Sequence, residues 1–107
     1  MDASEKKKWA EKQLTQEQSL MMAKDGIWKM WTSEEVVRFQ LFQEYLCMDF
    51  EHFHKSLEDV LGRPVFTHEL AFRDGLVEEY LGTKEAPSLG DIINLFPHEK
   101  RSIIGLD

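Results

Sequence analysis

The chain has 107 residues, a formal net charge of −7, 42% hydrophobic residues and a single cysteine. This length indicates one domain, which buries roughly 65% of its unfolded surface and folds without disulfide support. Cys47 excludes an internal disulfide, and no stretch resembles a signal peptide or the ~18 apolar residues of a membrane helix. We therefore expect a soluble protein in the reducing cytoplasm.

The charge is unevenly distributed along the chain. Residues 1–31 carry six lysines against five acids, a net charge of +1, whereas residues 32–107 carry seven basic and fifteen acidic residues, a net charge of −8. A surface this acidic disfavours direct binding of nucleic acid. Two interpretations stay open: a solvated surface that keeps the protein soluble, or a surface selected for a basic partner or for imitating DNA.

We expect residues 1–31 to form an N-terminal helical arm, because the segment lacks proline and is rich in good helix formers. Asp25-Gly26 would end this helix. We expect the first part of the arm to project or to dock loosely, and the cluster from Ile27 to Trp31 to be buried. Trp28 and Trp31 suit either a core or an exposed anchor for a partner.

Two amphipathic helices are predicted next, and they would be central. Thr32 and Glu35 have the spacing of a capping box, and the apolar spacing that follows predicts a helix that continues to Met48. Asp49 is a suitable N-cap for a second helix, which Gly62 and the following proline would end. Because almost no linker separates the two helices, they should cross at a steep angle.

The remaining residues predict shorter helices. Thr67 would start one, in which Gly75 either costs a continuous helix about 1 kcal/mol or marks a turn between two helices. Ser88 with Asp91 predicts a further capped helix, and a last one would follow Pro97 and end at Gly105. The expected fold is all-α: a compact bundle of five to six short helices, with the arm at 1–31 and an acidic helical domain at 32–107.

A search for chemistry finds no strong motif. Glu51, His54 and Glu58 share one helix face and could converge on a cation, although a solvated face with Lys55 paired to both glutamates explains them as well. Cys47 reads as a buried, inert thiol. We expect no enzymatic activity and no cofactor, because the glycines do not form a phosphate loop and no serine sits in a nucleophile elbow.

A resemblance covers about residues 33–106. The runs FQLFQEYLCMDFEHFHKSLEDVLGRPVFTHEL and EAPSLGDIINLFPHEKRSIIGL resemble a group of small uncharacterised proteins from bacteriophages and prophage regions. The motifs LGRPVFTHEL and the closing PHEKR are the most specific parts of this resemblance. The resemblance implies a genetic context and no activity that can be carried over to particular residues.

These observations favour a non-enzymatic protein-interaction module. We expect it to be phage-encoded and to bind a host protein, such as a defence or nucleic-acid-handling protein, through its acidic surface. The expected partner-binding residues are the acids Glu34, Glu35, Glu78 and Glu79 and the aromatic anchors Trp28, Trp31, Phe72 and Tyr80. The alternatives are an assembly subunit that forms homo-oligomers through apolar helix faces and, third, a metal-dependent function at Glu51, His54 and Glu58.

Overall fold

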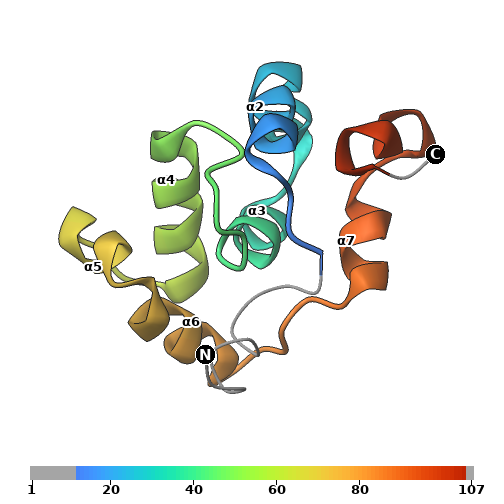
Figure 1. Ribbon diagram of the computed structural model, residues 1–107. Helices are drawn as coiled ribbons and strands as arrows, with labels where there is room; N and C mark the ends of the chain where they lie inside the picture. The colour runs from blue at the N-terminus through green and yellow to red at the C-terminus, as the bar shows by residue number, and fades with distance from the viewer. Residues whose placement is uncertain (1–11, 106–107) are drawn as a thin grey trace, which may run out of the picture.

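The computed structural model describes residues 12–105 (Figure 1). This part of the chain is all-α and contains no strand, as predicted. Its helices, in chain order, are α2 (Gln16–Asp25), the 3-10 helix η1 (Ile27–Met30), α3 (Ser33–Gln40), α4 (Phe50–Leu61), α5 (Thr67–Ala71), α6 (Arg73–Leu81), α7 (Leu89–Leu95) and the 3-10 helix η2 (His98–Ile104).

The described part of the N-terminal arm is built into the core. Thr15 and Gln18 form a capping box that starts α2, and Gly26 ends the helix in the left-handed conformation at φ 78°, as the Asp25-Gly26 pair predicts. Leu14, Met22 and Trp28 are all at most 2% exposed. Loose docking is therefore a wrong expectation for residues 12–25, while residues 1–11 lie outside the described part. In the cluster from Ile27 to Trp31, Ile27 and Trp28 are buried as expected, whereas Met30 is 87% exposed.

The predicted capping box of α3 is confirmed, and its predicted length is wrong. The Thr32 hydroxyl accepts the N–H of Glu35 at 3.2 Å, and the Glu35 carboxylate accepts the N–H of Thr32 at 2.8 Å. However, α3 ends at Gln40, and residues 41–49 form a loop rather than a continuation to Met48. Leu41 and Phe42 are fully buried in this loop. The apolar spacing that predicted a longer helix therefore marks residues that are buried, although they are not helical.

In this loop, buried polar side chains make the hydrogen bonds that the backbone of a helix would otherwise make with itself. The amide of Gln40 donates to the carbonyl of Tyr45 at 2.9 Å and accepts the N–H of Cys47 at 2.7 Å. The amide of Gln43 donates to the carbonyl of Lys12 at 2.8 Å and accepts the N–H of Leu14 at 3.0 Å. Both glutamines are 1% exposed, and they satisfy backbone groups that would otherwise be buried without partners.

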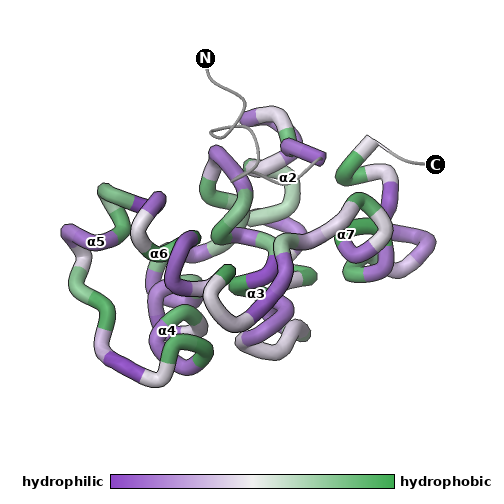
Figure 2. Tube along the Cα trace, turned by 90° about the horizontal axis from the view of Figure 1, so that it is seen from below, coloured by the Kyte–Doolittle hydropathy of each residue, from purple (hydrophilic) through white to green (hydrophobic). Residues whose placement is uncertain are grey.

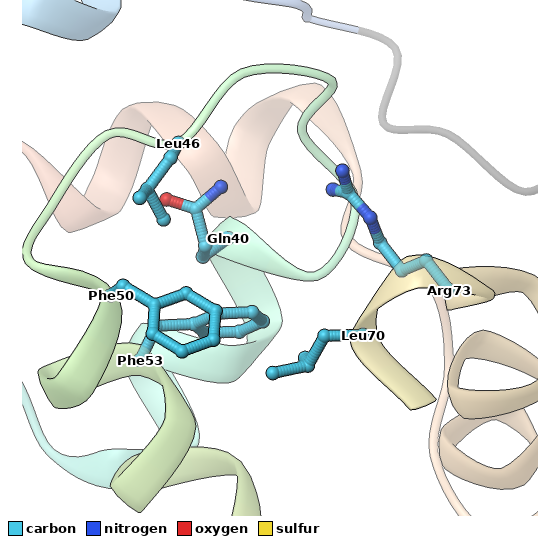
Figure 3. A pocket seen from close by; sticks show the side chains of 6 residues that line it. All are labelled: Gln40, Leu46, Phe50, Phe53, Leu70 and Arg73. Carbon is cyan, nitrogen blue, oxygen red and sulfur yellow. The ribbon is translucent and has the colours of Figure 1, made fainter. Parts of the chain in front are cut away.

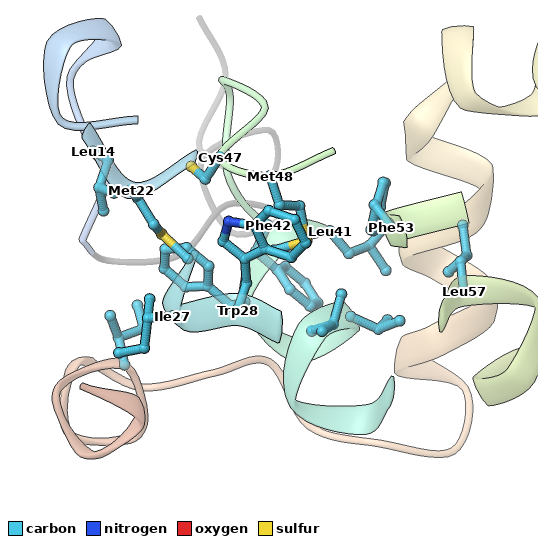
Figure 4. Packing of buried hydrophobic residues seen from close by; sticks show 14 of the residues in the cluster. Leu14, Met22, Ile27, Trp28, Leu41, Phe42, Cys47, Met48, Phe53 and Leu57 are labelled. Carbon is cyan, nitrogen blue, oxygen red and sulfur yellow. The ribbon is translucent and has the colours of Figure 1, made fainter. Parts of the chain in front are cut away.

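Helix α4 begins and ends where the sequence predicts. Asp49 occupies the N-cap position, although its side chain makes no capping hydrogen bond, and Gly62 closes the helix at φ 70°. Among the described helices, α3 and α4 make the most extensive contact with each other (Figure 1). Phe53 and Leu57 of α4 belong to the same buried cluster as Met22 and Trp28 from the N-terminal segment (Figure 4).

The segment after Pro64 forms two helices that meet at Phe72. Phe72 has φ −117° and ψ 63°, which is not helical, whereas Gly75 lies inside the first turn of α6. The break therefore falls two residues before the Asp74-Gly75 pair that suggested a turn. Helix α5 begins at Thr67, as predicted, and Phe66 is its N-cap.

The C-terminal helices cover the opposite side of α3 from α5 (Figure 1). Ser88 and Asp91 form the predicted capping box of α7. The helix after Pro97 is present as 3-10 helix and ends at Gly105. The rings of Trp31, Phe39 and Phe96 pack edge to face with centroids 5.5–5.7 Å apart, so this aromatic cluster joins η1, α3 and α7.

Candidate functional site

Helix α5 stands out because it is weakly buried and borders several hollows. It contains no buried residue and lies at the edge of the fold beside α4 and α6 (Figure 1). Three surface pockets of about 150, 460 and 290 Å³ all include residues of α5 or of its junction with α6. We call the exposed surface formed by Phe66, His68 and Phe72 the α5 face.

Two phenylalanines of the α5 face point into solvent. Phe66 is 63% exposed and Phe72 is 76% exposed. The ring of Phe66 stacks on that of His68, with centroids 5.8 Å apart and planes 9° apart. Hydrophobic positions thus lie along α5 at the outer edge of the molecule (Figure 2), where an aromatic ring contributes nothing to the core.

An ion-pair network fixes α5 to the rest of the fold. The guanidinium of Arg63 donates to both carboxylate oxygens of Glu69, at 2.9 and 3.2 Å, and to both of Glu79, at 2.8 and 3.1 Å. Glu69 also accepts the N–H of Phe66 at 2.8 Å. The bonds from Arg63 and Phe66 lower the pKa of Glu69 to about 2, and Arg63 lowers the pKa of Glu79 as well.

The pocket of about 150 Å³ lies between α4 and α5, and we call it the α4–α5 pocket. Its apolar walls come from the loop, from α4 and from α5 (Figure 3). It is lined by Gln40, Leu46, Phe50, Phe53, Leu70 and Arg73. Leu46 is 45% exposed and Phe50 is 42% exposed, so the pocket has an apolar entrance as well as an apolar interior.

Burial contradicts two of the four expected aromatic anchors. Trp28 is 2% exposed and packs edge to face on His52 at 4.8 Å, and Tyr80 is 1% exposed and packs on Phe42 at 5.6 Å. Their rings fill the core, so the expectation that they anchor a partner from the surface is wrong. Trp31 is half-buried between Phe39 and Phe96, and Phe72 alone of the four is largely exposed.

The expected acidic contacts Glu34, Glu35 and Glu79 bind groups within the fold. Glu34 accepts the Tyr80 hydroxyl at 2.9 Å and lies 3.8 Å from the Lys84 ammonium. Glu35 closes the capping box of α3, and Glu79 holds Arg63. Glu78 is exposed on α6. Glu79 lines the same pocket as His68 and Phe72 of the α5 face, whereas Glu34 and Glu35 lie at the start of α3.

The predicted metal face does not assemble in the described part of the chain. No group of three or more His, Cys, Asp or Glu residues between 12 and 105 is placed to hold a metal ion. A ring nitrogen of His54 instead contacts the carbonyl of Val65, and the Glu58 carboxylate accepts the N–H of Val65 at 2.8 Å. These two side chains thus tie the segment before α5 to α4, and Glu51 stays apart and exposed.

Cys47 is buried, as expected, and burial raises the pKa of its thiol to about 11. Its sulfur lies 3.3 Å from the Ser19 hydroxyl and 3.3 Å from the carbonyl of Tyr45. A thiol with so little thiolate at neutral pH is a poor nucleophile and a poor metal ligand.

Several residues of this site were missed by reasoning from the sequence. Leu46, Phe50, Arg63 and Phe66 are absent from the predicted partner-binding residues. One signal was available: Phe66 and Phe72 lie outside the set of core-facing positions Leu70, Leu76, Val77, Tyr80 and Leu81. Large apolar residues left over from a core pattern indicate an exposed apolar surface.

Comparison with known proteins gives one similarity. A family model described as a domain of unknown function (DUF7736) matches residues 34–86. No curated protein and no solved structure matches the chain. None of the helices described between residues 12 and 105 is long and apolar enough to span a membrane. The matched range runs from the first turn of α3 to the linker after α6, and so the α5 face and the α4–α5 pocket lie within the region that is similar to this domain family.

Proposed function

We propose that the protein is a non-enzymatic protein-interaction module that binds its partner through the α5 face. The observation that carries this proposal is the 76% exposure of Phe72 at the α5–α6 junction. Phe72 lines two of the three pockets, so an incoming side chain can pack beside its ring. Aromatic anchors beside such hollows typically dominate the energy of protein–protein interfaces.

The charge around the α5 face favours a basic partner. Asp74 and Glu78 are exposed on α6, and Arg63 is already neutralised by Glu69 and Glu79. An acidic rim attracts a positively charged surface and speeds the encounter between the two proteins. The same acidity disfavours nucleic acid as the direct ligand.

The biological setting of the proposal follows from the resemblance to small phage and prophage proteins. In that setting the partner is a bacterial protein, such as a defence or nucleic-acid-handling protein, whose activity is inhibited or modulated on binding. A basic groove that normally holds nucleic acid would suit both the acidity and the apolar anchor. This step is supported by analogy between small phage proteins.

The test compares two single substitutions of exposed apolar residues. The tagged protein, Phe72→Ala and Met30→Ala are each used to capture proteins from a bacterial lysate, and the affinity for any captured protein is then measured with purified components. Met30 is the matched control because it is 87% exposed and lies on η1, away from α5. Loss of an aromatic anchor costs about 2 kcal/mol or more, which is roughly a thirtyfold loss of affinity.

The outcomes separate the candidate functions. A protein that binds the parent and Met30→Ala, and binds Phe72→Ala at least tenfold more weakly, supports the proposal. Equal binding to all three variants contradicts it. The homo-oligomeric assembly subunit would instead be favoured if the molecular mass measured by sedimentation increases with protein concentration and is lower for Phe72→Ala.

A further inference from the structure

Resting on the proposed function, we propose that the α4–α5 pocket binds a single uncharged ring or branched aliphatic side chain that a basic segment of the partner presents. The proposal names the chemistry of the occupant: one apolar anchor flanked by lysine or arginine. The size of the pocket, the engagement of its polar residues and the charge of its rim all favour such an occupant.

The size of the pocket fits one side chain. Its volume is about 150 Å³, and its walls include Leu46, Phe50, Phe53 and Leu70 (Figure 3). An apolar cavity of about 150 Å³ is large enough to bind benzene. The pocket therefore has room for one phenyl ring or one branched aliphatic group, and not for an extended ligand.

The two polar residues that line the pocket are engaged with the protein itself. The Gln40 amide bonds to the backbone of Tyr45 and Cys47, as described above. The guanidinium of Arg73 is directed at the loop, where it donates to the carbonyl of Gln43 and, at 3.3 Å, to that of Glu44 (Figure 3). The interior accordingly selects an occupant by its apolar surface and shape.

The surroundings of the pocket are acidic. Glu44, Asp49, Glu51 and Asp74 are all exposed and lie within two residues of a lining residue in the sequence. Arg73 is the one cation among the lining residues, and desolvation lowers its pKa. By the same measure Lys55 is exposed two residues from the lining residue Phe53, so four carboxylates stand against one ammonium and one guanidinium. The balance is still negative, and charge complementarity favours cationic groups next to the anchor.

The experiment uses small probes that share one ring and differ in charge. Benzylamine, benzyl alcohol and phenylacetate are titrated into the ¹⁵N-labelled full chain at pH 7, and amide chemical shifts are followed. We expect shifts at Leu46, Phe50, Phe53 and Leu70, and binding of benzylamine at least threefold tighter than binding of phenylacetate. In about 1 M salt, where the Debye length is about 3 Å, this preference should largely disappear.

Matched variants locate the binding and the charge effect. Leu46→Ala should weaken all three probes at least threefold, whereas Leu89→Ala should not, since Leu89 is similarly exposed at 41% and lies on α7. Glu44→Gln with Glu51→Gln should remove the preference for benzylamine. Glu85→Gln with Glu99→Gln removes two exposed acids away from the pocket and should leave the preference intact.

The inference is overturned if the pocket residues show no shifts, if Leu46→Ala binds like the parent, or if phenylacetate binds as tightly as benzylamine at low salt. These results do not depend on any partner. If the probes fail to bind but capture of a partner still depends on Phe72, the proposal for the pocket is contradicted and the proposed function of the α5 face is not. If the probes bind but capture does not depend on Phe72, the proposed function is contradicted and the inference about the pocket is supported.

Discussion

The side-chain oxygen of Gln40 accepts the backbone N–H of Cys47 at 2.7 Å, seven residues along the chain and inside the core. Together with the bond to the carbonyl of Tyr45, this contact sets the path of the loop that separates α3 from α4. The loop supplies Leu46 to the α4–α5 pocket, so a buried glutamine shapes a surface feature.

Replacing Gln40 with leucine should therefore be strongly destabilising. The change keeps the approximate shape but leaves the buried N–H of Cys47 without a partner and the carbonyl of Tyr45 with only its contact to the Cys47 thiol. A buried group that loses its hydrogen bond costs about 1–3 kcal/mol. We expect the free energy of unfolding, measured by urea denaturation, to fall by about 3 kcal/mol. Gln16→Leu, at an exposed position in the first turn of α2, is the control and should change it by less than about 0.5 kcal/mol. A similar loss in both variants would show that the Gln40 bonds contribute little.

The capping box of α3 gives a second prediction. Thr32→Ala removes the oxygen that accepts the N–H of Glu35, and loss of such a cap typically costs about 1 kcal/mol. Thermal or urea unfolding should report this loss. Thr83→Ala is the matched control, because Thr83 is exposed in the turn after α6 and caps no helix. Equal stability of the two variants would count against a capping role for Thr32.

Local signals in the sequence predicted most of the helix boundaries. The Thr32–Glu35 and Ser88–Asp91 boxes act within four residues, so neighbouring side chains decide them. Gly62 and Gly105 adopt left-handed conformations at φ 70° and 78°, which a side chain would disfavour, and their positions as helix ends could also be predicted. The same kind of signal at Thr15 and Gln18 was present and was missed.

Long-range contacts decided what the sequence could not predict. The apolar spacing from Val37 to Met48 is compatible with a helix, and the helix ends early because Gln43 binds the backbone at Lys12 and Leu14, about thirty residues away. Burial of Tyr80 likewise depends on Phe42 and Glu34, which are distant in the sequence. Periodicity can place Phe72 outside the core pattern, but only the fold shows that α5 leaves it uncovered.

The Arg63 network predicts a defined response to acid. The pKa of Glu69 is about 2, below its ordinary value of 4.5, because Arg63 and the N–H of Phe66 bind the carboxylate. A lowered pKa means that the stabilisation of α5 is complete above about pH 4.5 and is lost as the pH falls toward 2. An NMR titration of the Glu69 carboxyl carbon, with the amide shifts of α5, should show both effects together.

Two arginine variants test the cause of that shift. Arg63→Gln should return the pKa of Glu69 most of the way to its ordinary value. Arg101→Gln removes the same charge at a residue whose Nε donates to the carbonyl of Phe96, and it should leave Glu69 unchanged. If both variants shift Glu69 equally, net charge and not the Arg63 contact lowers its pKa.

Burial of Cys47 predicts that its thiol reacts slowly with thiol reagents. Burial raises its pKa to about 11 from an ordinary value of 9.0, so the thiolate fraction at pH 8 should be about a hundredfold below that of an exposed cysteine. Labelling with a thiol reagent at pH 8 should accordingly be at least a hundredfold slower in the native protein than in urea, because access is also restricted. The rate should rise in Gln40→Leu, since that change weakens the loop that covers the sulfur. Rapid labelling of the native chain, at a rate near that in urea, would mean that the loop opens readily and that the α4–α5 pocket is not preformed.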